Sequence, residues 1–348
     1  MRTDMRQALR HFPADLLLAA RRVFAREFVQ VERISPALDR IVAPGTVPER
    51  IAEGFGYTEG PVWMPEGHLL FGDLPHNVIR RWTPPGRVEV IRLRSGYADA
   101  DIPPGRAMGS NGMTRDAEGR LTICEPGNRR VTRLEPDGRL TILADRFEGK
   151  RLNSPNDLVY RSDGSLYFTD PPHGLLHEDR DQLKELPFNG VYRYADGRLQ
   201  VLSTDLRRPN GIAFSPGEEY LYVSNSDPRR KIWMRYDVRP DGSITNGRVF
   251  LDLNARYGQP PDGLKVDQEG HVYCTCPGGL CVVSPQGVVL GFIRTKYEPS
   301  NCAWGDDGRT LYMTAVRCLY RIRLQIPGAP WPSIPRVILH DQRNDETW

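Results

Sequence analysis

The stretch NGIAFSPGEEYLYVSNSDPRRKIWMRYDVRPDGSITNGRVFLDL, residues 210–253, alternates apolar and polar side chains between turns that contain Gly or Pro. It divides into NGIAF, YLYVSNS, KIWMRYDV and VFLDL, with the turns SPGEE and PDG between them. A period of two residues is typical of β-strands, because successive side chains point to opposite faces of a sheet. The stretch therefore predicts one blade of four strands joined by short connections.

The same pattern recurs along the chain, and each copy begins with a polar residue that we call its starter. The starters are Glu59, Asn111, Asn156, Asn210, Asp262 and Asn301, which lie 52, 45, 54, 52 and 39 residues apart. This period is typical of β-propeller blades. The last copy has only three evident strands, so we expect RIAEGF (50–55) to supply its outer strand and close the ring. The predicted fold is all-β, a six-bladed β-propeller with an N-terminal helical extension.

Three regions are expected along the chain: an N-terminal extension over 1–47, a catalytic propeller domain over 48–325 and a Pro-rich tail over 326–348. Residues 14–28 predict an amphipathic helix, because apolar side chains recur on one side of it after Asp15. This extension would pack either on the propeller or on a second subunit of a homo-oligomer.

Composition excludes several classes of protein. The 348 residues carry a net charge of only +3, whereas nucleic-acid binders usually show a concentrated basic face. No apolar stretch approaches the roughly 20 residues that cross a bilayer, and no secretory signal is evident, so we expect a cytoplasmic protein without a membrane partner. The six cysteines lack a paired CxxC framework. Cys274, Cys276 and Cys281 would lie close together across a hairpin, where buried thiols are favoured over a thiolate metal site.

The starters are expected to share one end of the propeller. In a four-stranded up-and-down blade, the start of the inner strand and the loop between the second and third strands lie at the same end. The starters offer only carboxylate and amide oxygens, which favour calcium, magnesium or manganese over softer metals. Asn-Gly and Asp-Gly pairs also mark ordinary turns, which is the alternative interpretation. The recurrence of one register in every copy favours a shared cation site.

Several motifs resemble those of a known family. They are EGPVW (59–63), NSPND (153–157), YFTDPPHGL (167–175), ELPFNGVYR (185–193), RRPNGIAFSP (207–216), PDGLKVD (261–267) and LYRIRL (319–324). In this order they resemble the gluconolactonase branch of the senescence marker protein (regucalcin) and luciferin-regenerating enzyme family, over about residues 48–325.

The resemblance implies a six-bladed propeller that hydrolyses lactones and binds one divalent cation, calcium foremost, with magnesium, manganese or zinc as alternatives. By motif it implies Glu59, Asn156, Asn210 and Asp262 as metal ligands and Asp262 as the general base. One position departs from the family, because animal members place a sugar-binding arginine where this chain has Ser154. The particular lactone therefore stays open.

These observations predict a metal-dependent lactonase that opens a small-molecule sugar lactone, such as gluconolactone, to its hydroxy acid. Asn111, His173 and Asp227 are the further candidates for contacts with the substrate. No G-x-S-x-G or HExxH motif indicates a covalent or zinc-helix mechanism. The alternatives are a hydrolase of another lactone, ester or phosphotriester, and a non-enzymatic propeller that binds a partner protein. Two acids among the starters argue against the latter.

Overall fold

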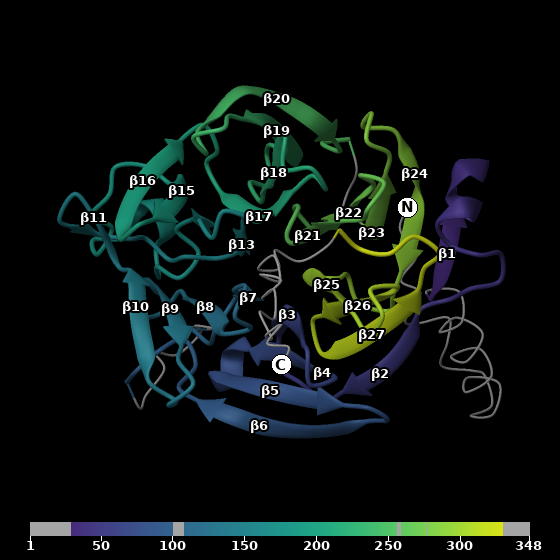
Figure 1. The fold of residues 1–348 in the computed structure, drawn as a ribbon, viewed down its shortest axis with the longest axis horizontal. Helices are drawn as coiled ribbons and strands as arrows, with labels where there is room; N and C mark the ends of the chain where they lie inside the picture. The colour runs from purple at the N-terminus through teal and green to yellow at the C-terminus, as the bar shows by residue number, and fades with distance from the viewer. Residues whose placement is uncertain (1–28, 100–107, 256–258, 277, 330–348) are drawn as a thin grey trace, which may run out of the picture.

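Six antiparallel sheets surround a central axis in the computed structural model, which describes residues 29–99, 108–255, 259–276 and 278–329 (Figure 1). The predicted all-β, six-bladed propeller is thereby confirmed. The helix predicted over 14–28 lies outside the described residues. None of the helical turns within them has the length and apolar character of a membrane span.

Each blade runs from an inner strand at the axis to an outer strand at the rim. The strands of blades one to three are β3 (Thr58–Met64), β4 (His68–Asp73), β5 (Val78–Thr83) and β6 (Arg87–Leu93); β7 (Met113–Arg115), β8 (Leu121–Glu125), β9 (Arg130–Leu134) and β10 (Leu140–Ala144); and β13 (Leu158–Tyr160), β14 (Leu166–Asp170), β15 (Gly190–Ala195) and β16 (Arg198–Ser203). Those of blades four to six are β17 (Pro209–Phe214), β18 (Tyr220–Asn225), β19 (Ile232–Val238) and β20 (Ile244–Asp252); β21 (Leu264–Val266), β22 (Val272–Cys276), β23 (Gly279–Val283) and β24 (Val289–Arg294); and β25 (Asn301–Gly305), β26 (Thr310–Ala315), β27 (Cys318–Arg323) and β2 (Glu49–Glu53).

Blade six closes the ring with strands from both ends of the repeat array. The outer strand β2 pairs antiparallel with β27, and Glu49 lies opposite Arg321. The expectation that residues 50–55 complete the last blade is therefore confirmed. The inner strands β3, β7, β13, β17, β21 and β25 contact one another in this order, and β25 returns to β3.

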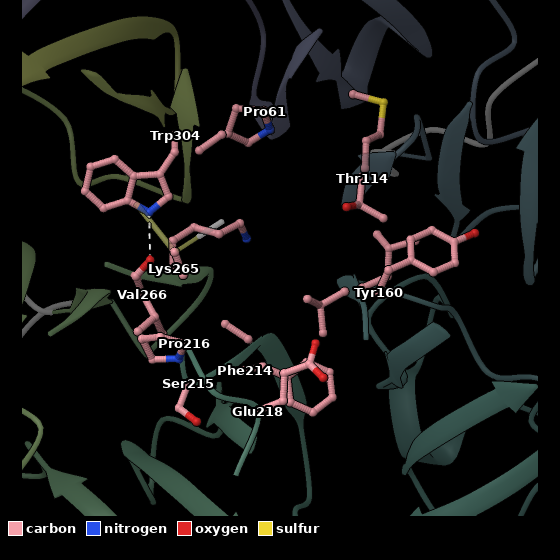
Figure 2. Close-up of a pocket in the computed structure, with 16 residues that line it drawn as sticks. Pro61, Thr114, Tyr160, Phe214, Ser215, Pro216, Glu218, Lys265, Val266 and Trp304 are labelled. Carbon is pink, nitrogen blue, oxygen red and sulfur yellow. Dashed lines mark hydrogen bonds between the residues drawn. The ribbon is translucent and has the colours of Figure 1, made fainter. Parts of the chain in front are cut away.

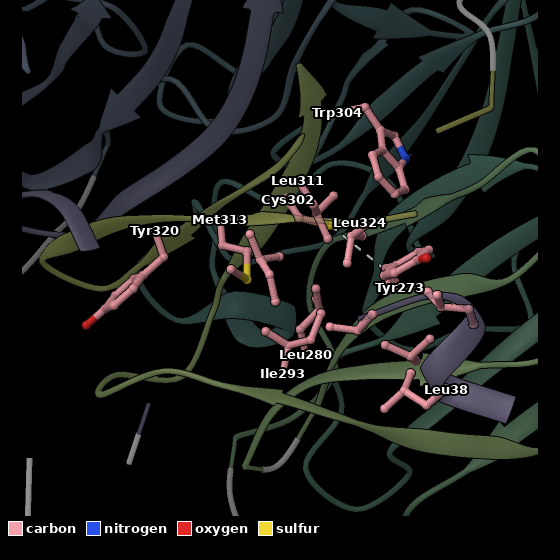
Figure 3. Packing of buried hydrophobic residues seen from close by; sticks show 14 of the residues in the cluster. Leu38, Tyr273, Leu280, Ile293, Cys302, Trp304, Leu311, Met313, Tyr320 and Leu324 are labelled. Carbon is pink, nitrogen blue, oxygen red and sulfur yellow. Dashed lines mark hydrogen bonds between the residues drawn. The ribbon is translucent and has the colours of Figure 1, made fainter. Parts of the chain in front are cut away.

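The described part of the N-terminal region, residues 29–47, packs on the propeller of its own chain. Strand β1 (Gln30–Arg33) pairs with β24 and gives blade five a fifth strand. The 3-10 helix η2 (Pro36–Arg40) follows it and buries Leu38 completely. Figure 3 shows Leu38 in one cluster with Leu280 and Ile293 of blade five, and the cluster extends to Met313 of blade six. Apolar burial thus fixes this segment across two blades.

Short elements fill the connections between strands. They are the helical turns η3 (Leu74–His76) and η4 (Glu178–Arg180) and the hairpin β11 (Arg146–Phe147) and β12 (Lys150–Arg151). All six cysteines are free and buried. Cys274 lies opposite Cys281 across β22 and β23, which confirms the expected proximity. Burial raises the pKa of the Cys274 thiol, as expected for an apolar strand position.

Candidate active site

The glycines that follow four starters let neighbouring inner strands approach one another. A Cβ atom on Gly112 would lie 2.6 Å from the Asn156 carbonyl oxygen, and one on Gly263 would lie 2.1 Å from the Asn301 side chain. The Gly112 amide donates a hydrogen bond to that carbonyl of Asn156 at 2.7 Å. These Asn-Gly and Asp-Gly pairs lie at the starts of inner strands. Because their glycines have no side chain, neighbouring inner strands pack closely, and the starters lie near one another.

Replacing Gly112 by Ala is expected to lower the free energy of unfolding by about 3 kcal/mol, because the new methyl group forces two inner strands apart. Urea denaturation of the variant and the parent measures this effect. Gly86→Ala is the matched control, since a Cβ there meets no atom within 4 Å. Equal loss in both variants would contradict the close approach of the strands.

Five blades contribute to one cavity of about 320 Å³ at the end where the starters gather. The residues that line it are Tyr57, Glu59, Asn111, Asn156, His173, Arg208, Asn210, Ser226, Gln259, Pro260, Pro261 and Asp262. The structure thus brings together the four residues proposed as metal ligands, and Asn111 and His173 lie in the same lining. Asn301, the sixth starter, does not line the cavity; its side chain hydrogen-bonds Glu59.

Hydroxyl groups on the second strands hold the starters in place. Thr169 donates a hydrogen bond to the Asn210 carbonyl oxygen, and Ser224 donates one to the Asp262 carbonyl oxygen, each at 2.7 Å. Both bonds join neighbouring blades. The backbone of the starters is therefore positioned by contacts between blades rather than by each blade alone.

Two buried carboxylates, Glu59 and Asp157, lie close to the partly buried carboxylate of Asp262. The ion pairs of the described residues all involve other acids, so none of the three has a cationic partner there. Burial and the charge of Asp262 raise the pKa of Glu59 well above its ordinary value. Burial and the charge of Asp157 raise the pKa of Asp262 to about 7. Such crowding of like charges favours either a bound proton or a bound cation.

The donor set fits a hard divalent cation. The Asn210 amide oxygen is buried and has no hydrogen-bond partner in the structure, so a ligand atom is available beside the acids. In the described ranges, no three His, Cys, Asp or Glu side chains form a metal-binding group. A cation here would therefore depend on amide oxygens together with Glu59 and Asp262, as calcium sites with mixed oxygen ligands do.

Polar side chains on two loops form the outer rim of the cavity. His173 Nε2 lies 2.8 Å from the Ser226 hydroxyl, and His173 Nδ1 lies 3.5 Å from a Glu178 carboxylate oxygen. Arg208 forms an ion pair with the same Glu178. One carboxylate thus orients both the imidazole and the guanidinium at the rim.

Sequence reasoning missed several lining residues, although a regular signal was present. Tyr57 and Arg208 each stand two residues before a starter, the position that Ser154 occupies in blade three. Ser154 itself is buried, and its hydroxyl holds the loop that carries His173. The hydroxyl donates a hydrogen bond to the Pro171 carbonyl oxygen at 2.5 Å and accepts one from the Gly174 amide at 2.8 Å. An arginine therefore reaches this cavity from blade four, whereas blade three uses a small hydroxyl to hold the loop of His173.

Asp227 is not among the residues that line the cavity. Its carboxylate accepts a hydrogen bond from the Arg229 amide at 3.0 Å and lies 3.9 Å from the Arg207 guanidinium. The adjacent Ser226 lines the cavity in its place.

Residues 57–317 match the family described as the SMP-30/Gluconolactonase/LRE-like region. The chain belongs to this family. The membership inferred from the motifs is confirmed, and the matched residues include all six starters, the full inner ring and the cavity described above.

Relatives of this family member agree with the assignment. A gluconolactonase from Zymomonas mobilis subsp. mobilis is 38% identical, over 86% of this chain and 87% of its own. A diisopropyl-fluorophosphatase from Loligo vulgaris is 24% identical, over 76% of this chain and 87% of its own. The solved structure of a gluconolactonase from Xanthomonas campestris has a TM-score of 0.74 at 32% identity, covering 85% of this chain and 94% of its own.

Proposed function

We propose that this protein is a metal-dependent lactonase that opens a sugar lactone, such as gluconolactone, to its hydroxy acid. The observation that carries the proposal is the convergence of amide oxygens with the carboxylates of Glu59 and Asp262, which have no cationic partner among the described residues, in one cavity of a gluconolactonase-family propeller. The 38% identical gluconolactonase from Zymomonas mobilis subsp. mobilis supports the substrate class. Calcium is the proposed cation because it accepts irregular sets of oxygen ligands; magnesium, manganese and zinc are the alternatives.

Glu59, Asn156, Asn210 and Asp262 would hold the cation. When bound, the cation supplies an electrophile that polarises the lactone carbonyl and stabilises negative charge on its oxygen. The two carboxylates would balance the double positive charge of the cation. Because calcium takes six to eight oxygen ligands, these four residues would leave coordination positions for the substrate. The mutual repulsion of the buried acids would be relieved at the same time.

Asp262 is proposed as the general base. Its carboxylate takes a proton from a water molecule as the water oxygen forms a bond to the carbonyl carbon, and the ring C–O bond then breaks. The proton passes to the departing ring oxygen, so Asp262 returns to its ionised state.

The lining of the cavity supports a polyhydroxylated substrate. Tyr57, Asn111, His173, Arg208 and Ser226 present hydroxyl, amide, imidazole and guanidinium groups, which exchange hydrogen bonds with sugar hydroxyls. Burial and the charges of Asp262 and Glu59 raise the pKa of the Tyr57 hydroxyl well above its ordinary value, which keeps it a hydrogen-bond donor. The volume of about 320 Å³ suits a single small ring.

A substrate panel tests the proposal. Proton release in a pH-stat with calcium is expected to show kcat/KM values for glucono- and galactonolactone at least about a hundredfold above those for simple aliphatic lactones. The reason is that a site built for hydroxyl groups rejects analogues that lack them. Spontaneous hydrolysis without protein provides the blank for each compound.

Each other outcome of the panel identifies an alternative. Turnover of aliphatic lactones or esters alone would contradict the sugar substrate. Faster turnover of diisopropyl fluorophosphate, the compound in the name of the Loligo vulgaris relative, would favour a phosphotriester hydrolase. No turnover of any compound would favour a protein-binding propeller.

A further inference from the structure

A second cavity, of about 100 Å³, lies in the central channel at the end opposite the starters (Figure 2). Every blade contributes to its lining through the inner strand or the residues just after it. One representative from each blade is Pro61, Thr114, Tyr160, Phe214, Lys265 and Trp304.

This cavity is separate from the candidate active site. The two linings have no residue in common. Lys265 follows Asp262 by three residues along the inner strand of blade five, which corresponds to about 10 Å at the usual rise of a strand. The closely packed glycines that follow the starters lie between the two cavities.

Lys265 supplies the uncompensated charge of this cavity. Its ammonium group donates a hydrogen bond to the Leu264 carbonyl oxygen at 3.0 Å and takes part in none of the ion pairs found in the described chain. Glu218 also lines the cavity, but its carboxylate accepts hydrogen bonds from the Ser162 amide at 2.7 Å and hydroxyl at 2.6 Å. The same carboxylate lies 3.5 Å from the Arg161 guanidinium. Figure 2 shows the Lys265 side chain extending into the space between the blades.

The remaining surface is largely apolar or already hydrogen-bonded. The Trp304 indole N–H donates to the Val266 carbonyl oxygen at 2.9 Å, and the Tyr160 hydroxyl bonds Thr122 at 2.9 Å. Leu158 and Phe214 present hydrocarbon to the cavity. A ligand here would meet one free cation and an apolar wall.

We propose that this cavity binds a small monocarboxylate with an apolar body, its carboxylate on the Lys265 ammonium and its carbon chain against Leu158, Phe214 and Trp304. A single ammonium matches a single negative charge, whereas a phosphate would require more donors than the lining offers. A sugar acid is unsuited, because its hydroxyls would lose water without gaining partners on the apolar wall. A cavity smaller than the roughly 150 Å³ that holds benzene limits the body to a short chain.

Binding of butanoate to the full-length, calcium-loaded protein tests the proposal. The indole N–H resonance of Trp304, assigned through Trp304→Phe, is followed by NMR as a reporter inside the cavity. Butanoate is expected to shift it saturably, and butan-1-ol at least about tenfold more weakly. Lys265→Met should weaken butanoate binding at least about tenfold, since a charge-assisted hydrogen bond is lost. Lys265→Arg should retain the binding.

Controls separate this site from the active site. Lys150→Met, on the exposed hairpin of β11 and β12, should leave butanoate binding unchanged. Lys265→Met should hydrolyse gluconolactone at the rate of the parent, which would also show that this variant folds. Equal affinity for the acid and the alcohol, or unchanged affinity in Lys265→Met, would overturn the proposal. No saturable shift would also overturn it. If the resonance shifts only in a variant truncated after Ala329, and not in the full-length chain, the cavity binds residues 330–348 instead of a free carboxylate.

Discussion

Replacing Asp262 by Asn is expected to lower kcat for gluconolactone about a thousandfold, because the amide keeps the size of the side chain but cannot accept the proton of the attacking water. The rate is measured at saturating calcium, since Asp262 is also a proposed metal ligand. Calcium affinity is measured separately by calorimetry. This pair of measurements distinguishes loss of the base from loss of the ion.

Asp196→Asn is the matched control for this experiment. Asp196 is an exposed turn residue with a φ of 50°, a backbone conformation that Asn adopts readily, so neither stability nor rate should change. If Asp262→Asn retains a kcat within threefold of the parent at saturating calcium, Asp262 is not the base. Loss of calcium affinity with kcat retained would show that Asp262 is a metal ligand but not the base.

Removal of calcium is expected to abolish lactone hydrolysis and to make the protein less stable as the pH rises. The folded pKa of Asp262 is about 7, compared with an ordinary value of 3.8, so the metal-free folded chain binds a proton that the unfolded chain releases. Between about pH 4 and pH 7 the folded state holds more protons, and its stability therefore falls as the pH rises through this interval. Above pH 7 the full loss is present, because both states are then ionised.

Calcium should reverse this loss, because the cation replaces the proton among the acids. We expect saturating calcium to raise the Tm by at least roughly 5 °C at pH 8 and by much less at pH 5, where protons compete for the same oxygens. Thermal unfolding with EDTA or calcium at the two pH values measures the difference. Hydrolysis that persists in EDTA, or a Tm that calcium leaves unchanged at pH 8, would be inconsistent with the metal site.

Glu59→Gln provides the matched variant for this experiment. It removes one buried carboxylate while keeping an oxygen ligand, so calcium affinity should fall about a hundredfold and the loss of stability with pH should become smaller. Glu53→Gln changes an exposed carboxylate on the outer strand β2 and should alter neither property. Equal behaviour of the two variants would exclude Glu59 as a ligand.

Much of the fold could be predicted from the sequence because the decisive information is local. Alternation with a period of two fixes which side chains of a strand are buried, and the residues from Asn210 onward show it over a whole blade. The repeat of the starters gave the number of blades. The incomplete last copy then required an outer strand, and the chain offered one at residues 50–55.

The candidate site could be predicted only in part. The starters were found because they recur at one position of the repeat, which places them at the same end of the ring. Arg208 shares its position two residues before a starter with Tyr57 and Ser154, but the residue type differs in each copy. Ser226 carries no such recurrence, and it reaches the cavity where its neighbour Asp227 was expected. Which of two adjacent side chains faces a cavity depends on the path of the loop, and the sequence alone does not specify that path.

The sequence by itself determined the strands, the six blades, the closure of the ring and the family, because each follows from patterns within one repeat or between its copies. Only the tertiary structure decided that residues 29–47 cover blades five and six, that Asp157 joins Glu59 and Asp262, and that Lys265 stands in an apolar cavity below them. These contacts join residues from different blades. Such residues are far apart in the chain, and they become neighbours only when the ring closes and its inner strands pack at the glycines.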